Sequence, residues 1–267
     1  ATREEIEHLK DCLQTLDANP ALYTTPIAMD DLNEVREALG FAEINLLGGS
    51  YGTRAALVYI RRHGDTVRSA VLDGLAPLTM TIPANVAHDA QAAFQQLLAD
   101  CAAQAGCAQA FPDLEQHFRA LVQRFRDEPR QVEFVHPRTG ERRIGKLDPL
   151  MFNRLIRSVM YERTLSSLLP LAIEQAYKDN FEPLLTLGFT FTGEDPKMSV
   201  GMMASVLCSE DMQRVSQANH SEDFDNQIYS ALAPICEFWP QGVIPESYFQ
   251  AVASEIPTLL LSGKLDP

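Results

Sequence analysis

A serine between glycines, in Gly48-Gly49-Ser50-Tyr51-Gly52, is the feature that most constrains the fold. The apolar run 44–47 before it predicts a short buried strand, and residues 53–60 after it have helix-forming composition with apolar spacing. Gly-x-Ser-x-Gly between a strand and a helix is typical of a nucleophile elbow, a strained turn that raises the serine hydroxyl above the sheet edge. We expect glycine at 48 and 52 because a Cβ on either flank would collide with neighbouring backbone. The alternative is a serine in an ordinary glycine-rich turn, and the flanking strand and helix favour the elbow.

The rest of the chain supplies further strands of the same apolar character. Helices are predicted at 2–16 and 30–39, with a third running from the elbow to about residue 62. Uniformly apolar strands that alternate with helices predict an α/β fold, with a mostly parallel sheet and helices on both faces. The predicted strands are 44–47, 69–72 and 258–262.

The middle of the chain is mainly helical in pattern. Its clearest helices are 90–103, 114–125 and 165–177, and a hairpin is predicted from 131–135 and 141–144. A structureless connection of this length inside one domain is implausible. We therefore predict a large helical cap at 79–252, inserted between core segments 1–78 and 253–267.

Composition limits the partners and the cofactors. Asp plus Glu number 36 against 22 Lys plus Arg, a net charge of −14, and no basic stripe is visible. Phosphate binding needs clustered cations, so we expect no nucleic acid partner. No apolar run approaches the roughly 20 residues of a membrane span. No Cys-x-x-Cys or histidine cluster is present, so we expect no metal and no cofactor.

Five cysteines leave the redox state open from the residues alone. Cys101 and Cys107 bracket a short segment that could close a disulfide loop, and Cys208 and Cys236 could pair within one region, which leaves Cys12 odd. Bridges would indicate an oxidising compartment. Five reduced thiols in a cytosolic enzyme are an equal alternative.

An activated serine needs an acid and a histidine, which follow it in that order in enzymes with this elbow. Asp266 follows the last apolar strand through Ser262-Gly263, so the carboxyl edge of the sheet would bring it towards Ser50. The alternative is an Asp-Pro turn. The backbone N–H of Tyr51 is the predicted oxyanion donor. All six histidines precede Asp266, and we expect His63 and His136 to be solvated; the others are His8, His88, His117 and His220.

Several segments resemble the bacterial proline-iminopeptidase and tripeptidyl-aminopeptidase branch of the α/β-hydrolases. The likeness spans nearly the whole chain, although residues 121–195 share only a helical character with that branch. The matching segments are Tyr23-Thr24-Thr25, Asp30-Asp31-Leu32, residues 44–54, Val71-Leu72-Asp73-Gly74, Cys208-Ser209-Glu210-Asp211 and residues 259–267.

The resemblance implies a serine aminopeptidase on the α/β-hydrolase fold, with Ser50 as nucleophile and Asp266 as the acid of the triad. It also implies export, to the periplasm or outside the cell, with disulfides and a peptide substrate. The chain begins at Ala1 without Met and stops at Pro267 in a predicted loop. We therefore expect a fragment, inactive alone, with the catalytic histidine beyond Pro267 and the second oxyanion donor before Ala1.

Selection of a free amino terminus needs a desolvated carboxylate that pairs with the ammonium. Glu210 and Asp211 are the predicted pair, and helix capping with solvation is an equal alternative. The methionines Met198, Met202, Met203 and Met212 would line an apolar substrate pocket or form plain core. Two other functions stay open: an esterase or lipase-like hydrolase on the same fold, and a catalytically silent binding protein.

Overall fold

The computed structural model describes residues 3–192, 199–215, 223–224 and 227–267. The chain divides into two compact units. The first comprises Ala1–Asn85, Ser199–Ala218 and Ile228–Gly263, and the second Val86–Met198, Asn219–Gln227 and Lys264–Pro267. This division places Ser199–Ala218 and Ile228–Gly263 in the same unit as the sheet. The predicted boundaries of the core (1–78 and 253–267) and of the cap (79–252) stay predictions.

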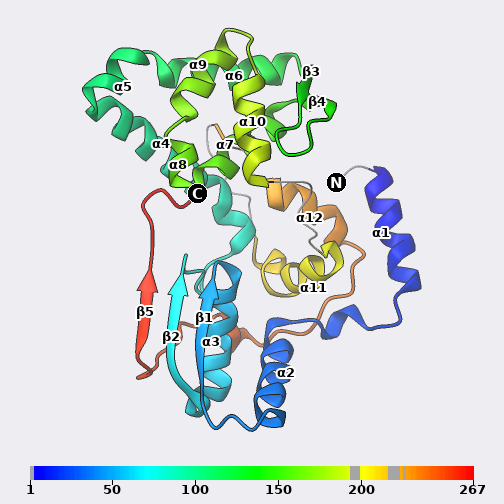
Figure 1. Cartoon of the computed structure of the whole chain (residues 1–267). Helices are drawn as coiled ribbons and strands as arrows, with labels where there is room; N and C mark the ends of the chain where they lie inside the picture. The colour runs from blue at the N-terminus through cyan, green and yellow to red at the C-terminus, as the bar shows by residue number, and fades with distance from the viewer. Residues whose placement is uncertain (1–2, 193–198, 216–222, 225–226) are drawn as a thin grey trace. The chain divides into compact units, whose positions relative to one another are not determined.

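The first unit is built on a three-stranded parallel sheet with the order β1-β2-β5. The strands point the same way side by side in Figure 1, so all three carboxyl ends lie at one edge. They are β1 (Ile44–Gly49), β2 (Val67–Asp73) and β5 (Thr258–Leu261). The three predicted strands are therefore confirmed, and β1 continues through Gly48 and Gly49.

Alternate strand residues face helix α3 (Tyr51–His63) and form a small core. Ile44 and Leu46 of β1 and Ala70 and Leu72 of β2 pack in one apolar cluster with Tyr59 of α3. Leu47, the next residue of β1, belongs to the opposite face of the sheet and is 83% exposed. This period-2 pattern fixes the register, because a slip of one residue would turn the apolar set away from α3.

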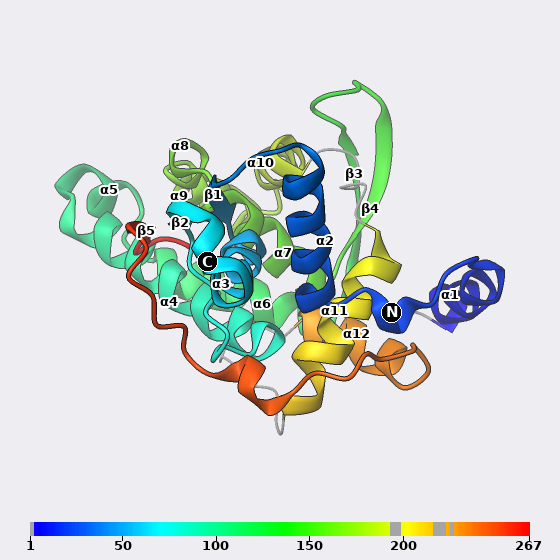
Figure 2. The ribbon, with the colours of Figure 1, turned by 90° about the horizontal axis from the view of Figure 1, so that it is seen from below.

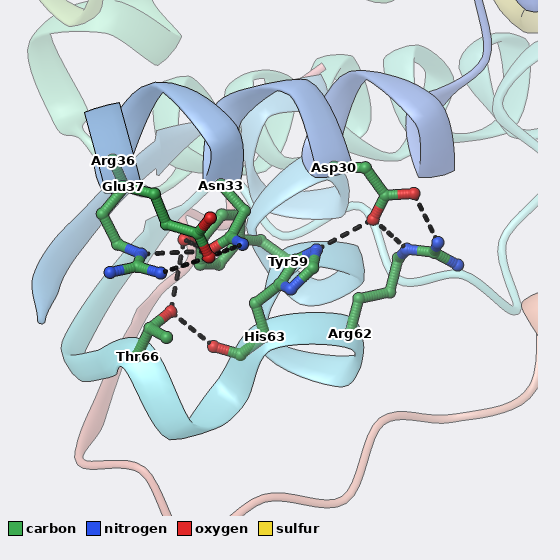
Figure 3. A network of polar contacts seen from close by, with 8 residues as sticks. All are labelled: Asp30, Asn33, Arg36, Glu37, Tyr59, Arg62, His63 and Thr66. Atoms are coloured by element: carbon green, nitrogen blue, oxygen red, sulfur yellow. Dashed lines mark hydrogen bonds and ion pairs between the residues drawn. The ribbon is translucent and has the colours of Figure 1, made fainter. Parts of the chain in front are cut away.

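Helix α2 (Thr25–Ala38) lies beside α3, as Figures 1 and 2 both show. It begins five residues before the predicted helix, because Thr24 is an extended N-cap and Pro26 lies in the first turn. A polar network joins the two helices (Figure 3). Asp30 binds Arg62 Nε at 2.7 Å and His63 Nε2 at 2.8 Å, and Tyr59 donates to Asn33 Oδ1 at 3.0 Å.

The remaining helices of the first unit carry the acidic pair. Ser199 caps α11 (Val200–Glu210) by accepting the N–H of Met202. A disulfide between Cys208 and Cys236 joins α11 to α12 (Gln227–Cys236). The other elements are α1 (Arg3–Thr15), η1 (Pro20–Leu22), η2 (Gly64–Thr66), η3 (Met212–Arg214) and η4 (Glu246–Phe249).

The second unit is helical with one antiparallel hairpin, as predicted, and a phenylalanine-rich core. A second disulfide, Cys101–Cys107, joins the end of its first helix to the next. The predicted helix 165–177 is broken at Ser167-Leu168, before Pro170. The elements are α4 (Ile82–Ala103, whose first four residues belong to the first unit), α5 (Ala105–Ala110), α6 (Leu114–Asp127), β3 (Arg130–Val135), β4 (Arg142–Leu147), α7 (Pro149–Met160), α8 (Arg163–Ser166), α9 (Leu169–Tyr177) and α10 (Glu182–Thr192).

The expectation that His136 is solvated is wrong, since the residue is 1% exposed. His136 stabilises the turn between β3 and β4, because its Nδ1 accepts hydrogen bonds from the backbone N–H groups of Arg138 and Thr139. His63 is also partly buried, against Asp30. Both histidines therefore serve local structure.

Candidate active site

Ser50 joins β1 to α3 with a backbone that L-residues rarely adopt. Its φ is 52° and its ψ is −123°, and its side chain lies at the exposed carboxyl end of the strand. Such strain persists only where the surrounding structure imposes it, and it clusters at functional sites. Here Ser50 N donates to Asp73 O at 2.9 Å, which extends the pairing of β1 with β2 into the turn. The strand–turn–helix context expected of a nucleophile elbow is therefore present.

Of the two glycines that flank the serine, only Gly48 is required by its surroundings. A Cβ on Gly48 would lie 2.4 Å from Gly52 O, a distance that no side chain tolerates, so position 48 requires glycine. A Cβ on Gly52 would meet nothing within 4 Å. The expectation of a collision at Gly52 is therefore wrong. The close approach is between the backbone of Gly52 and the Cβ position of Gly48, whereas the space in which a Cβ of Gly52 would lie is empty.

Thr53 braces the elbow, and sequence reasoning missed it. The side chain is fully buried. Its Oγ1 donates to Ser50 O at 2.7 Å and accepts the N–H of Ala76 at 2.8 Å. One sequence signal could have indicated that Thr53 supports the turn. It is a hydroxyl three residues after the nucleophile, among residues that otherwise favour a helix.

Tyr51 is the first residue of α3, where backbone N–H groups have no partner within the helix. The helix dipole adds positive potential at this end. The Tyr51 hydroxyl lies 2.6 Å from Thr25 Oγ1. Burial raises the pKa of this hydroxyl to about 12, so it keeps its proton at neutral pH. These features suit the predicted role of the Tyr51 N–H at an oxyanion.

Glu210 is fully buried and bound to protein donors through both oxygens. Oε1 accepts the N–H of Thr25 at 2.6 Å, and Oε2 accepts Thr25 Oγ1 at 2.8 Å and the hydroxyl of Tyr248. Burial raises the pKa of the Glu210 carboxyl, and the three hydrogen bonds oppose that rise. Thr25 and Tyr248 are partners that sequence reasoning missed, although Thr25 belongs to a segment that carries the resemblance.

Asp211 is fully buried in an ion pair with Arg54 of α3. Arg54 Nη1 donates to Asp211 Oδ2 at 2.7 Å, and Ile82 N donates to Oδ1 at 3.1 Å. The second guanidinium nitrogen donates to Pro77 O and Met80 O. Arg54 lies one helical turn beyond Ser50, so this cluster fixes the start of α3 against the segment that follows β2.

Asp266 lies beyond β5, in the segment that groups with the second unit, and its side chain is exposed. Its neighbours are held there: Leu265 packs against the core of that unit, and Arg157 donates to Pro267 O at 3.2 Å. The triad role of Asp266 stays a prediction. His63 lies at the far end of α3, about 20 Å from Ser50 at 1.5 Å per residue, so it is too distant to act as the base.

Met202 lines a cavity of about 210 Å³ together with Pro20, Tyr23 and Trp239. Met203 and Met212 instead pack against the apolar cluster around Trp239. Met198 lies outside the described residues, as does His220. Met203 and Met212 are therefore core residues, and a role of Met202 in a substrate pocket stays a prediction.

Among the residues that the structure describes, no helix is both long enough and apolar enough to span a bilayer. Within the same residues, no three His, Cys, Asp or Glu side chains gather as metal ligands.

Comparison with known proteins adds evidence about the family. Over 80 residues, the chain is 41% identical to the serine protease Hip1 of Mycobacterium tuberculosis and to that of Mycobacterium bovis, a match that covers 29% of this chain and 15% of each relative. It is 31% identical over 85 residues to the putative hydrolase YuaR of Escherichia coli, which covers 30% and 17%. The matches thus span less than a fifth of any of these relatives. The model of the alpha/beta hydrolase fold matches residues 15–154, just over half of the chain. Together with the parallel sheet and the elbow at Ser50, this match shows that the chain belongs to the alpha/beta hydrolase fold family.

Proposed function

We propose that this protein is a serine hydrolase that releases residues from the free amino terminus of peptides through an acyl-enzyme on Ser50. The observation that carries the hydrolase assignment is the backbone of Ser50, held at a φ of 52° on a strand–helix turn. Such strain has a use when the hydroxyl must project towards a substrate. The Tyr51 N–H then stabilises the oxyanion of the tetrahedral intermediate.

In this proposal the acyl-enzyme forms by attack of Ser50 Oγ on the scissile carbonyl carbon. A histidine takes the hydroxyl proton and passes it to the leaving amine, and Asp266 is the proposed acid that orients that histidine. Water then attacks the acyl carbon while the same histidine takes its proton, and the ester bond to Ser50 Oγ breaks as the histidine returns that proton to the serine. The start of α3 favours the negative charge in both steps through its dipole.

Peptides are the proposed substrates because the chain has local likeness to a serine protease and resembles aminopeptidases around Ser50. Selection of the free amino terminus by Glu210 and Asp211 stays a prediction. Both carboxylates are occupied by protein donors, so an ammonium would have to exchange with one of them or add to a remaining lone pair.

An oxidising compartment, the periplasm or the exterior, is the proposed location. Two disulfides support it, because such bonds persist where thiols are not kept reduced.

The test uses the full-length protein, a peptide anilide with a free amino terminus, its N-acetylated twin, and a Ser50→Ala control. Cleavage of the free form alone, abolished in the control, is the expected result. Equal cleavage of both forms would favour a broader peptidase or an esterase. Activity that survives Ser50→Ala would overturn the assignment of the nucleophile, and inertness towards peptides and esters would favour a binding protein.

A further inference from the structure

We propose that Glu210 is a positioning residue of the oxyanion site, acting through Thr25 on Tyr51. This inference rests on the proposed function, since it needs Ser50 to be the nucleophile. The four residues Tyr51, Thr25, Glu210 and Tyr248 form one chain of hydrogen bonds within the first unit.

The chain links the start of α3 to the end of α11 over a wide sequence separation. Glu210 binds both the backbone N–H and the Oγ1 of Thr25, 185 residues away. One carboxylate thus holds Thr25 by both its backbone and its side chain, which is itself fully buried. Thr25 Oγ1 therefore presents a fixed partner to the Tyr51 hydroxyl at 2.6 Å.

The carboxylate also sets the direction of the hydrogen bonds. The Thr25 hydroxyl has a single proton, and it donates that proton to Glu210 Oε2. Thr25 Oγ1 then accepts from Tyr51, whose hydroxyl must be the donor. Tyr248 donates to the same carboxylate oxygen from the other side. All of these donors thus point towards Glu210.

The consequence for catalysis comes from the place of Tyr51 in the chain. Its N–H follows the strained Ser50, and its side chain leaves from the adjoining Cα. Anchoring the hydroxyl at Thr25 restricts rotation of the residue about its backbone, while α3 holds the other side. An oxyanion donor contributes only when it lies about 2.7–3.1 Å from the developing charge, so small displacements are costly.

Positioning of the oxyanion donor differs from recognition of a substrate ammonium, and a pair of substrates distinguishes these two roles of Glu210. The probes are the free-amino peptide anilide and p-nitrophenyl acetate, which has no amino group. In the full-length protein, Glu210→Gln and Tyr51→Phe are each expected to lower kcat on both substrates by about 10- to 100-fold, with KM unchanged. Affinity for a boronate that forms a tetrahedral adduct on Ser50 should fall in parallel.

Matched variants separate positioning from a loss of fold. Tyr59→Phe removes a buried tyrosine hydroxyl from the same helix, one that binds Asn33 and Thr66, and should leave kcat unchanged on both probes. Thr25→Val should reproduce the loss seen in Tyr51→Phe, and Thr25→Ser should rescue it. Tyr51 is 38% exposed, so Tyr51→Phe tests the inference even where Glu210→Gln fails to fold.

Two outcomes would overturn the inference. The first is a wild-type kcat in Tyr51→Phe on both probes. The second is a Glu210→Gln defect confined to KM for the free-amino peptide, which would make Glu210 an ammonium receptor. Failure of the proposed function gives a different result, because the wild-type protein would then be inert on both probes or would keep its ester hydrolysis after Ser50→Ala.

Discussion

Arg54 and Asp211 form a buried ion pair across 157 residues of sequence, with Arg54 Nη1 2.7 Å from Asp211 Oδ2. Their side chains are 1% and 0% exposed. Arg54 lies four residues after Ser50 on α3, and Asp211 is the C-cap residue of α11. The pair therefore ties the helix that carries the elbow to the helix that carries Glu210, without itself contacting the reacting serine.

Removal of one partner should destabilise the fold strongly. Asp211→Asn leaves the Arg54 guanidinium buried without its counter-ion, which typically costs about 3–5 kcal/mol. Asp30→Asn is the control, since it perturbs a pair with Arg62, whose side chains are 37% and 42% exposed, together with the contact to His63. Exposed pairs of this kind contribute about 1 kcal/mol or less. Urea unfolding of the full-length protein measures both changes. Equal losses would mean that the buried pair is replaceable.

Gly48→Ala should disrupt the elbow, because the new Cβ would lie 2.4 Å from Gly52 O. The backbone must shift to relieve that contact, so we expect a lower thermal midpoint and a loss of at least about 100-fold in kcat/KM. Gly49→Ala is the stability control, since its Cβ meets nothing within 4 Å. If Gly48→Ala melts like wild type and keeps full activity, steric exclusion at position 48 is wrong.

The sequence predicted the sheet and the elbow because both depend on local signals. The run at 44–47 and the glycine pattern around Ser50 are contiguous, and the parallel direction follows from the intervening helix. Gly48 was explained correctly for the same reason, since the backbone it meets is only four residues away. Gly52 was explained wrongly, because the pattern alone does not say which glycine approaches which backbone.

The partners of the acidic pair could not be predicted, because they come from distant segments. Thr25 and Arg54 lie in segments that carry the resemblance, but no local signal there or around Tyr248 indicates that the tertiary fold brings these residues to Glu210 and Asp211. A general rule did apply: buried Asp and Glu are nearly always paired. It predicts that partners exist for Glu210 and Asp211, but it does not identify them.

Stability should depend on pH through Glu210, with a definite sign. Burial raises the pKa of this carboxyl above the 4.5 of an ordinary glutamate. Between the unfolded and folded pKa values the folded protein binds more protons, so the free energy of unfolding falls as pH rises. The stability of wild type relative to Glu210→Gln should therefore decrease as pH rises from the ordinary glutamate pKa through the raised pKa of the folded state.

Glu174 provides a control of opposite sign. A hydrogen bond from Lys178 lowers the pKa of Glu174, with a further contribution from His117. Its contribution to stability is present above the unfolded pKa and is lost as pH falls through the folded one. Wild type relative to Glu174→Gln should thus gain stability over the rising pH range. Urea titrations at several pH values measure both slopes, and slopes of the same sign would contradict the assigned environments.

The Cys208–Cys236 disulfide should affect both stability and activity. It closes a loop with a sequence separation of 28, for which chain entropy gives about 3–4 kcal/mol, and it anchors α11 two residues before Glu210. The variant with both cysteines replaced by serine should therefore lose stability and also kcat on p-nitrophenyl acetate, because the Glu210–Thr25–Tyr51 chain loosens.

The matched variant of Cys101 and Cys107 opens a loop with a separation of only 6, worth about 2 kcal/mol, in the other unit. It should lose less stability and keep kcat. Equal kcat losses in the two variants would show that the α11 anchor has no specific link to the oxyanion site, whereas a loss confined to the first would tie that disulfide to the position of Tyr51.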